Sequence, residues 1–154
     1  MMKSSHNRAL YDQLFIKIAR MHDEVAYRKH LNEYRGPGGQ WKNYPSVSVG
    51  AELYGCLAVG HHHYFSREKD FHPLVLQELT SRLGQLNCHG SNYPACTNMV
   101  GHCAENYAAS GVLDFFDPQN IDSDILSTIR FTKGFRPRTW KSIDWCANCH
   151  TMFD

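Results

Sequence analysis

Apolar side chains recur at intervals of four and three residues near the N-terminus, at Leu10, Leu14, Ile18, Met21 and Val25. This spacing puts them on one face of an α-helix, so the pattern predicts an N-terminal helix with one face packed against the rest of the protein. Ser4, Ser5 or Asn7 is the expected N-cap. The sequence GPGG at residues 36–39 is expected to end the helix or the loop after it.

A second pattern, between residues 44 and 64, is rich in valine and small residues and is interrupted by Gly50 and Gly55. It predicts two short strands joined by a tight connection. A second helix is expected at residues 73–86, where Pro73 suits the first turn. Its apolar face repeats at intervals of three and four residues: Leu76, Leu79, Leu83 and Leu86.

The C-terminal half alternates turn-forming and periodic segments. Residues 87–101 predict a loop, and residues 102–113 predict a helix. That helix carries small residues on one face, which allows close approach to a sheet: Ala104, Ala108 and Gly111. Alternation around Ile129 and Phe131 predicts a strand, and a last helix is expected from Cys146 with Asp144 as its N-cap. This order of elements predicts a three-layer α/β fold, with a central mixed sheet and helices on both faces.

Length and charge narrow the classes of function. The 154 residues are expected to form one domain, 1–154, with an N-terminal helix and Gly/Pro loop (1–39), a strand pair (44–64) and a C-terminal core (101–154). A net charge of +1 argues against nucleic-acid binding spread over the whole surface, but it allows a local basic stripe. No membrane span or signal peptide is visible. We therefore expect a cytoplasmic protein, or one delivered by a non-classical secretion route, with no membrane partner.

The six cysteines change this picture most, and without a signal peptide we interpret them as thiols or ligands rather than disulfides. The sequence WCANCH at residues 145–150 is compatible with a haem attachment site, a redox pair or half of a zinc site. Zinc is favoured because Cys103 heads another predicted helix. Together with Cys146 and Cys149 it supplies the three protein ligands of a catalytic zinc ion. Glu105, two residues after Cys103, is near enough to handle the proton of a water molecule there.

Cys-Ala-Glu at residues 103–105, followed by Cys-x-x-Cys at residues 146–149, resembles the paired motifs of the zinc-dependent cytidine deaminase superfamily. The sequence SVGAELYG at residues 48–55 is similar to the Val-Gly-Ala-Ala-Leu strand of its free-nucleoside members. The resemblance covers residues 46–153 and implies a cytidine-deaminase-like fold. It also implies that Cys103, Cys146 and Cys149 bind Zn²⁺, that Glu105 carries a proton to the base, and that the Ala104 N–H contacts the pyrimidine carbonyl. The implied reaction is hydrolytic loss of ammonia from C4 of cytosine, which gives uracil.

Three features depart from the family's pattern. Trp145 stands where proline is usual, and it could stack on a base or pack in the core. His102 lies three residues before Glu105 and could replace Cys103 as a ligand, although the family's spacing favours Cys103. The chain also lacks the strands and helix that follow Cys-x-x-Cys in the family, so the fold looks shortened at the C-terminus. We expect the sheet to be completed by residues 54–71, by a partner chain in a homo-oligomer, or not at all.

Residues 130–141 interleave basic and aromatic side chains and contain no acidic residue: Arg130, Phe131, Lys133, Phe135, Arg136, Arg138, Trp140 and Lys141. This combination is typical of single-strand nucleic-acid binding, so Arg136 and Arg138, with Trp145, are expected to contact substrate. A solvated strand with core aromatics is the alternative for this segment. The short toxin-type deaminases of polymorphic bacterial toxins look closest in style, which implies a DNA or RNA substrate and an inhibitor or immunity protein as partner.

Two other functions stay open. One is deamination of free cytidine or deoxycytidine, and the other is a non-catalytic structural zinc-binding domain in which His102 completes a Cys₃His set. Residues 61–63, three histidines, are interpreted as a strand end with solvated side chains, with His61 and His63 as a metal pair the alternative. Cys88, His89 and Cys96 are interpreted as ordinary side chains of a loop. The alternative is a second, structural zinc site that they form with His102.

Overall fold

The N-terminal helix forms as the periodicity predicts. The computed structural model of the chain describes residues 1–30 and 44–154, so the predicted break at residues 36–39 lies outside the described residues. Helix α1 spans Arg8–His30, and Leu10, Leu14 and Ile18 are its buried residues. Asn7 is the N-cap, because its Oδ1 accepts the N–H groups of two residues in the first turn, at 2.9 and 3.3 Å.

The predicted strand pair is an antiparallel hairpin. Strand β2 spans Ser48–Leu53 and β3 spans Cys56–His61, with Leu53 opposite Cys56. The connection consists of Tyr54 and Gly55, whose φ angles are +48° and +84°. Positive φ at both positions is the signature of the tight turn that matches the twist of a hairpin.

The sheet is mixed and has six strands, most of them short. Strands β4 (Arg130–Phe131) and β5 (Gly134–Phe135) pair antiparallel with opposite ends of β2, and β6 (Ser142–Ile143) pairs with β5. Between β4 and β5, the N–H of Thr132 donates to the Gly50 carbonyl and the Thr132 hydroxyl accepts the Gly50 N–H, both at 2.9 Å. The chain is thereby held against β2 across the gap.

Strand β1 (Lys3–Ser4) extends the sheet by pairing parallel with β4. The sequence-based expectation named residues 54–71, a partner chain or an incomplete sheet. Residues 54–71 do add strand β3 to the sheet, followed by the short helix η1 (Glu68–Asp70), and the expectation did not include the N-terminal strand. A two-residue strand shows no readable alternation, so the pattern of the sequence cannot reveal it.

Helix α3 spans Pro73–Arg82, with Pro73 in the first turn as predicted. It ends four residues before the predicted boundary, and Gly84, just beyond it, has a φ angle of +124° that only glycine adopts readily. Helix α4 spans Ala104–Leu113, α5 spans Ala147–Phe153, and short helices η2 (Pro118–Asn120) and η3 (Ser123–Thr128) lead to β4. Asp144 is not the cap of α5; Cys146 is, and the exposed Asp144 carboxylate lies 3.8 Å from the Nζ of Lys133.

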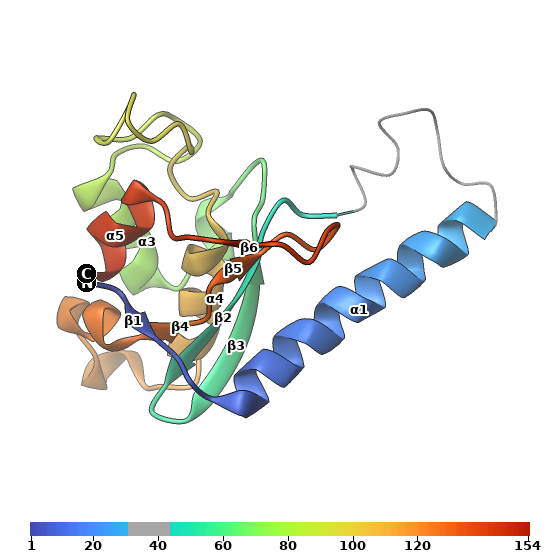
Figure 1. Cartoon of the computed structure of the whole chain (residues 1–154). Coiled ribbons are helices and arrows are strands. Elements are labelled where there is room, and N and C mark those ends of the chain that lie inside the picture. Colours follow the sequence, from blue (N-terminus) through green and yellow to red (C-terminus); the bar gives the residue numbers. More distant parts are fainter. Residues whose placement is uncertain (31–43) are drawn as a thin grey trace.

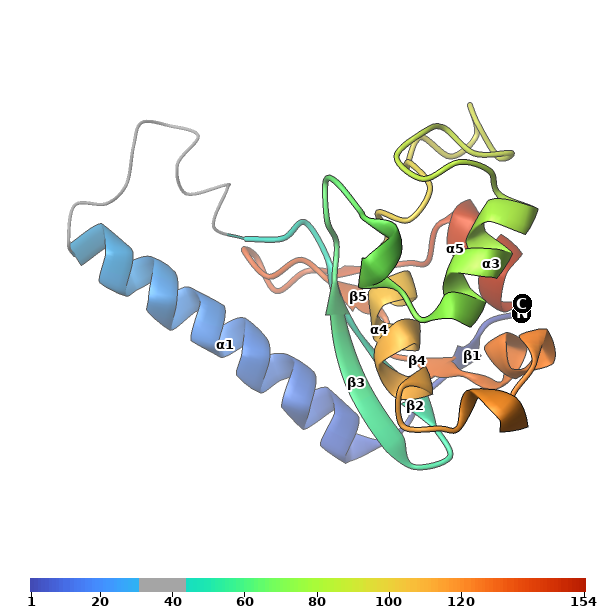
Figure 2. The same ribbon diagram turned by 180° about the vertical axis from the view of Figure 1, so that it is seen from behind.

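Helices lie on both faces of the sheet, so the general three-layer α/β prediction is confirmed (Figures 1 and 2). Helix α1 packs on one face, where a Cβ added at Gly50 would meet Leu10. Helix α4 packs on the other, with α3 and α5 beyond it. There a Cβ added at Gly60 would collide with the backbone of Ala104 and Ala108. No helix in the described part of the chain has the length and apolar character needed to cross a membrane.

Candidate metal centre

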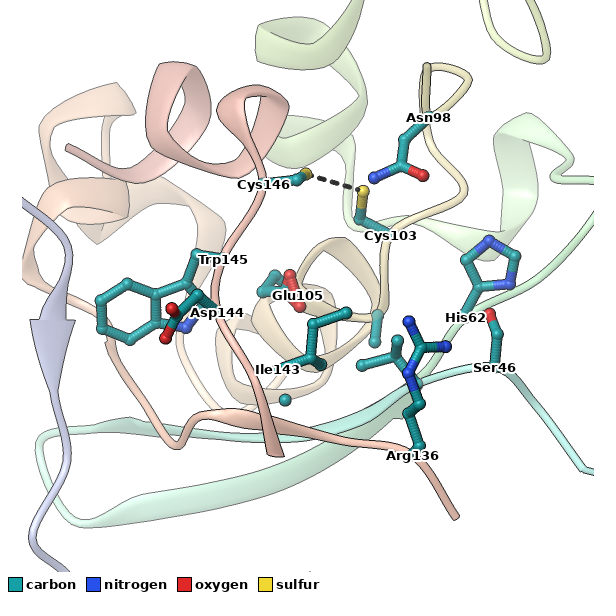
Figure 3. Close-up of a pocket in the computed structure, with 13 residues that line it drawn as sticks. Ser46, His62, Asn98, Cys103, Glu105, Arg136, Ile143, Asp144, Trp145 and Cys146 are labelled. Atoms are coloured by element: carbon teal, nitrogen blue, oxygen red, sulfur yellow. Dashed lines mark hydrogen bonds between the residues drawn. The ribbon is translucent and has the colours of Figure 1, made fainter. Parts of the chain in front are cut away.

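Three cysteines converge where two helices begin. Cys103 is the N-cap of α4, Cys146 is the N-cap of α5, and Cys149 lies in the first turn of α5. The Sγ atoms of Cys103 and Cys146 are 3.4 Å apart (Figure 3). Those of Cys146 and Cys149 are 3.6 Å apart. All three sulfurs lie within 4.8 Å of one another. Side chains separated by more than forty residues of sequence therefore form one cluster, which we call the cysteine cluster.

The spacing of the sulfurs fits a metal ion better than a disulfide. A disulfide requires an S–S distance of about 2.05 Å, far below the 3.4 and 3.6 Å found here. Around a tetrahedral zinc ion with Zn–S bonds of about 2.3 Å, neighbouring sulfurs lie about 3.8 Å apart. Two of the three sulfur pairs lie within a few tenths of an ångström of that separation, and the third lies within 4.8 Å. The three cysteines thus form a candidate metal site.

The ionisation of the thiols supports the same reading. Hydrogen bonds from Cys103 and Cys149 lower the pKa of Cys146. Hydrogen bonding to Cys146 raises the pKa of Cys103, and contacts with Cys103 and Cys146 raise that of Cys149, in both cases well above the usual value. Contacts among the sulfurs and burial therefore disfavour ionisation of Cys103 and Cys149 in the absence of a cation. A bound divalent metal would offset two of the three negative charges of the thiolates, and metal binding would release the protons of the thiols.

Glu105 lies beside the cluster, in the first turn of α4. Its side chain is buried, and its Oε2 accepts a hydrogen bond from the Cys149 thiol at 2.8 Å. Burial raises the pKa of Glu105 to about 7, and the hydrogen bond from Cys149 opposes that rise. A carboxyl group that titrates near neutral pH can both accept and release a proton under physiological conditions.

A cavity of about 170 Å³ opens onto Cys103, Cys146 and Glu105, and we call it the cluster cavity. It exceeds the space needed for one water molecule by about an order of magnitude. Small organic molecules therefore fit next to the cluster. Trp145 and Arg136 line its wall, approaching from the β5–β6 side (Figure 3).

The structure brings together most of the residues predicted to contact substrate. Ala104, Trp145 and Arg136 line the cluster cavity. Trp145 is half-buried, and its indole N–H donates to the Thr132 carbonyl at 3.2 Å, so one edge of the ring is held by the sheet. Arg138 lies outside the cluster cavity and lines an adjoining one.

The alternative ligands are not part of the cysteine cluster. His102 Nε2 lies 2.8 Å from Asn87 Oδ1, so that ring is engaged in a different contact. Within residues 1–30 and 44–154, the cysteine cluster is the one group with metal-ligand geometry. The alternative of a second site at Cys88, His89 and Cys96 with His102 does not form such a group in that part of the chain.

The sequence-based prediction missed His62 and Asn98, which both line the cluster cavity (Figure 3). His62 was interpreted as solvated, yet burial, together with His102 and His63, lowers its pKa to about 4. A hydrogen bond from Asn98 reaches Cys146. Strand alternation gave a usable signal for His62, because it follows Gly60 by two residues and Gly60 faces α4. Asn98 lies in an irregular loop, and no periodic pattern marks it.

Comparisons with known proteins identify no relative: no protein-family model, no curated protein and no solved structure matches the chain. The cysteine cluster, the adjacent Glu105 and the cavity that reaches both are therefore the basis for a functional inference.

Proposed function

We propose that the protein is a zinc-dependent hydrolase that converts cytosine to uracil in DNA or RNA. The observation that carries the proposal is the position of Glu105, whose carboxylate lies against the cysteine cluster and faces the same cavity. The two motifs that supply these residues are those that resemble the cytidine deaminase superfamily. Deamination of free cytidine is the alternative that shares every one of these residues.

The donor set suits zinc in a catalytic role. Thiolate ligands favour zinc, copper(I) and iron–sulfur clusters over hard cations. Catalytic zinc sites keep three protein ligands and one open position, whereas structural sites use four. Cys103, Cys146 and Cys149 would hold the ion, and the cavity beside them leaves room for the remaining position. Zinc bound there supplies a Lewis acid that favours ionisation of water near neutral pH.

Glu105 would move the protons of the reaction. Hydrolysis adds water to C4 of cytosine and releases ammonia, so a proton must leave the water and reach the ring and the departing amine. A buried carboxyl group with its pKa raised to about 7 is suited to both transfers. Its position in the first turn of α4 keeps it within reach of the cluster and of a ring in the cavity.

Backbone geometry offers a further contact. Ala104 is the first residue of α4 and lines the cluster cavity. The first N–H groups of a helix have no partner within the helix, and they carry part of its positive dipole. The N–H of Ala104 is therefore suited to donate to the carbonyl oxygen of a pyrimidine, which would fix the amino-bearing carbon near Glu105.

The test is a deamination assay on zinc-loaded protein. Cytidine, deoxycytidine, single- and double-stranded DNA, and RNA are incubated with wild type and with Glu105→Gln, and uracil is measured by mass spectrometry. We expect product with wild type and a loss of about 10²- to 10⁴-fold with Glu105→Gln, the usual contribution of a general acid–base.

Glu68→Gln is the matched control, because Glu68 is exposed and lies away from the cavity. It should retain full activity. Zinc binding without turnover of any of the five substrates would contradict the proposal and favour a structural zinc domain. Full activity of Glu105→Gln would also contradict it.

A further inference from the structure

A second cavity, of about 150 Å³, adjoins the cluster cavity. The two cavities share Ser46 and Arg136, so they meet along one wall. Arg138 and two tyrosines, Tyr44 and Tyr64, line the rest of the second cavity together with Pro45 and Thr139. A molecule that extends beyond the cluster cavity past Arg136 therefore enters a space with two guanidinium groups and two phenol rings.

These side chains suit a nucleotide. Arginine presents a planar fork of N–H donors that matches the oxygens of a phosphate. The Arg136 and Arg138 side chains are both exposed. Tyr64 is 74% exposed, so most of its ring is available for stacking. The ring contacts His62 edge-on, with 4.8 Å between centroids, which supports it from the side of the cluster cavity. Exposed aromatic rings beside basic groups are the means by which single strands are held.

The turn that carries the two arginines is braced by α1. The Arg136 N–H donates to the Lys141 carbonyl at 2.8 Å, and the Trp140 N–H donates to the Arg136 carbonyl at 2.7 Å. The Pro137 carbonyl contacts His22 Nε2 at 2.6 Å, and the Trp140 ring stacks on His22 at 5.5 Å. Contacts from α1 thus fix the position of the turn.

The same contacts change the role expected for the aromatic residues of the basic stripe at residues 130–141. Phe131 is fully buried against Phe153, and Phe135 and Trp140 pack against Phe15 of α1. None of the three aromatics of the stripe lines the second cavity. The aromatic residue available to stack on a base there is therefore Tyr64, which lies outside the stripe.

We propose that the second cavity holds the phosphodiester and base of the nucleotide next to the target cytosine. Arg136 and Arg138 bind the phosphate and Tyr64 stacks on the neighbouring base. The substrate is then a polynucleotide rather than a free nucleoside. This inference rests on the proposed function and deepens it.

Binding of a fluorescently labelled, cytosine-containing single-stranded oligonucleotide tests the inference without turnover. The zinc-loaded Glu105→Gln protein serves as the background, and Arg138→Ala and Tyr64→Ala are added to it. We expect each to weaken affinity by about tenfold, with stacking losses in the range found for other single-strand sites. Arg138→Ala should also lower the slope of log K against log salt by about 0.7, the value for one phosphate contact on a single strand.

Arg130→Ala is the matched control. It removes the same charge from an exposed position of β4. Arg130 pairs with Glu52 of β2, whereas Phe135, the residue before Arg136, pairs with Ser48 at the other end of β2. Glu52 and Ser48 are four residues apart along β2, which corresponds to about 13 Å. We expect less than a twofold change for this variant. Equal losses for Arg130→Ala and Arg138→Ala would overturn the inference, because a general loss of positive charge would then explain both.

Competition by cytidine and by cytidine monophosphate distinguishes binding of a phosphodiester in a polynucleotide from binding of the phosphate of a free nucleotide. We expect both to compete far more weakly than unlabelled oligonucleotide, and equal competition by the monophosphate would overturn the inference. Deamination of an oligonucleotide whose affinity is unaffected by Arg138→Ala and Tyr64→Ala would overturn it while leaving the proposed function intact. Loss of affinity in both variants of a protein that deaminates nothing would refute the proposed function and support the second cavity as a nucleic-acid site.

Discussion

Gly60→Ala probes the contact that positions the site. Gly60 lies in β3 directly under α4, and a Cβ at this position would collide with the Ala104 carbonyl oxygen and the Ala108 nitrogen. Both are backbone atoms of a helix, so no side-chain rotation relieves the collision. Helix α4 must move away from the sheet, and its first turn carries Cys103 and Glu105.

The magnitude follows from the kind of atoms involved. Adding a methylene to a packed core typically costs about 1–3 kcal/mol, and a collision with backbone falls at the upper end. We expect a loss of about 3 kcal/mol in the free energy of unfolding, measured by urea denaturation. For a chain of this size, that corresponds to a fall in Tm of about 6–12 °C. Because α4 carries Cys103, one of the three cysteines that we propose bind zinc, we also expect zinc affinity to fall by about 10- to 100-fold, as when ligand-supporting contacts are removed.

Gly55→Asn is the control for Gly60→Ala. Gly55 lies in the same hairpin, and a Cβ there would meet nothing within 4 Å. Asparagine tolerates the left-handed conformation better than other residues, so the cost should be about 1 kcal/mol or less. A Gly60→Ala protein with the unfolding free energy and zinc affinity of wild type would refute the close packing of α4 on β3.

Two further predictions concern the cluster and the histidines. Cys149→Ser should abolish stoichiometric zinc binding, whereas Cys88→Ser, at an exposed thiol, should leave it unchanged. If zinc is present at about 1,000 times its Kd, it adds about 4 kcal/mol of stability, so chelation should lower Tm by about 8–16 °C in wild type and leave the Cys149→Ser protein unaffected. Burial, with smaller effects from Lys17 and His63, lowers the pKa of His61 from 6.5 to about 4. Between those pH values the unfolded chain binds a proton that the folded chain does not. The free energy of unfolding, measured by urea denaturation at several pH values, should therefore fall as pH drops from 6.5 to 4, and less steeply in His61→Gln. The same dependence of the unfolding free energy on pH in both proteins would contradict this prediction.

The elements that the sequence predicted are those with long periodic patterns. Helix α1, the β2–β3 hairpin and α4 each bury a face over many residues, so spacing alone marks them. Strands β1, β5 and β6 have two residues each, and pairing partners rather than local pattern define them. The sequence could not predict that the N-terminus forms a strand of the sheet, because β1 and its partner β4 are more than 120 residues apart in the sequence.

The residues of the candidate site differ in the same way, because local spacing marks some of them and only the folded packing places the others. The cluster of Cys103, Cys146 and Cys149 was predictable because metal-binding motifs have short, recognisable spacings at helix starts. Asn98 enters the cavity through the packing of an irregular loop, which no local spacing records, whereas strand alternation gave a signal for His62. For the aromatics of residues 130–141 the sequence left both stacking on substrate and packing in the core open, and in the structure Phe135 and Trp140 contact Phe15 of α1. Sequence pattern identifies an apolar or aromatic side chain without identifying which surface it packs against.

X-ray absorption at the zinc edge of zinc-loaded protein tests the central claim most directly. Cys103, Cys146 and Cys149 around one ion with an open position predict one zinc per chain, three sulfur neighbours at about 2.3 Å and one oxygen neighbour. An imidazole or a fourth sulfur in the first shell, or fewer than three sulfurs, would contradict the account.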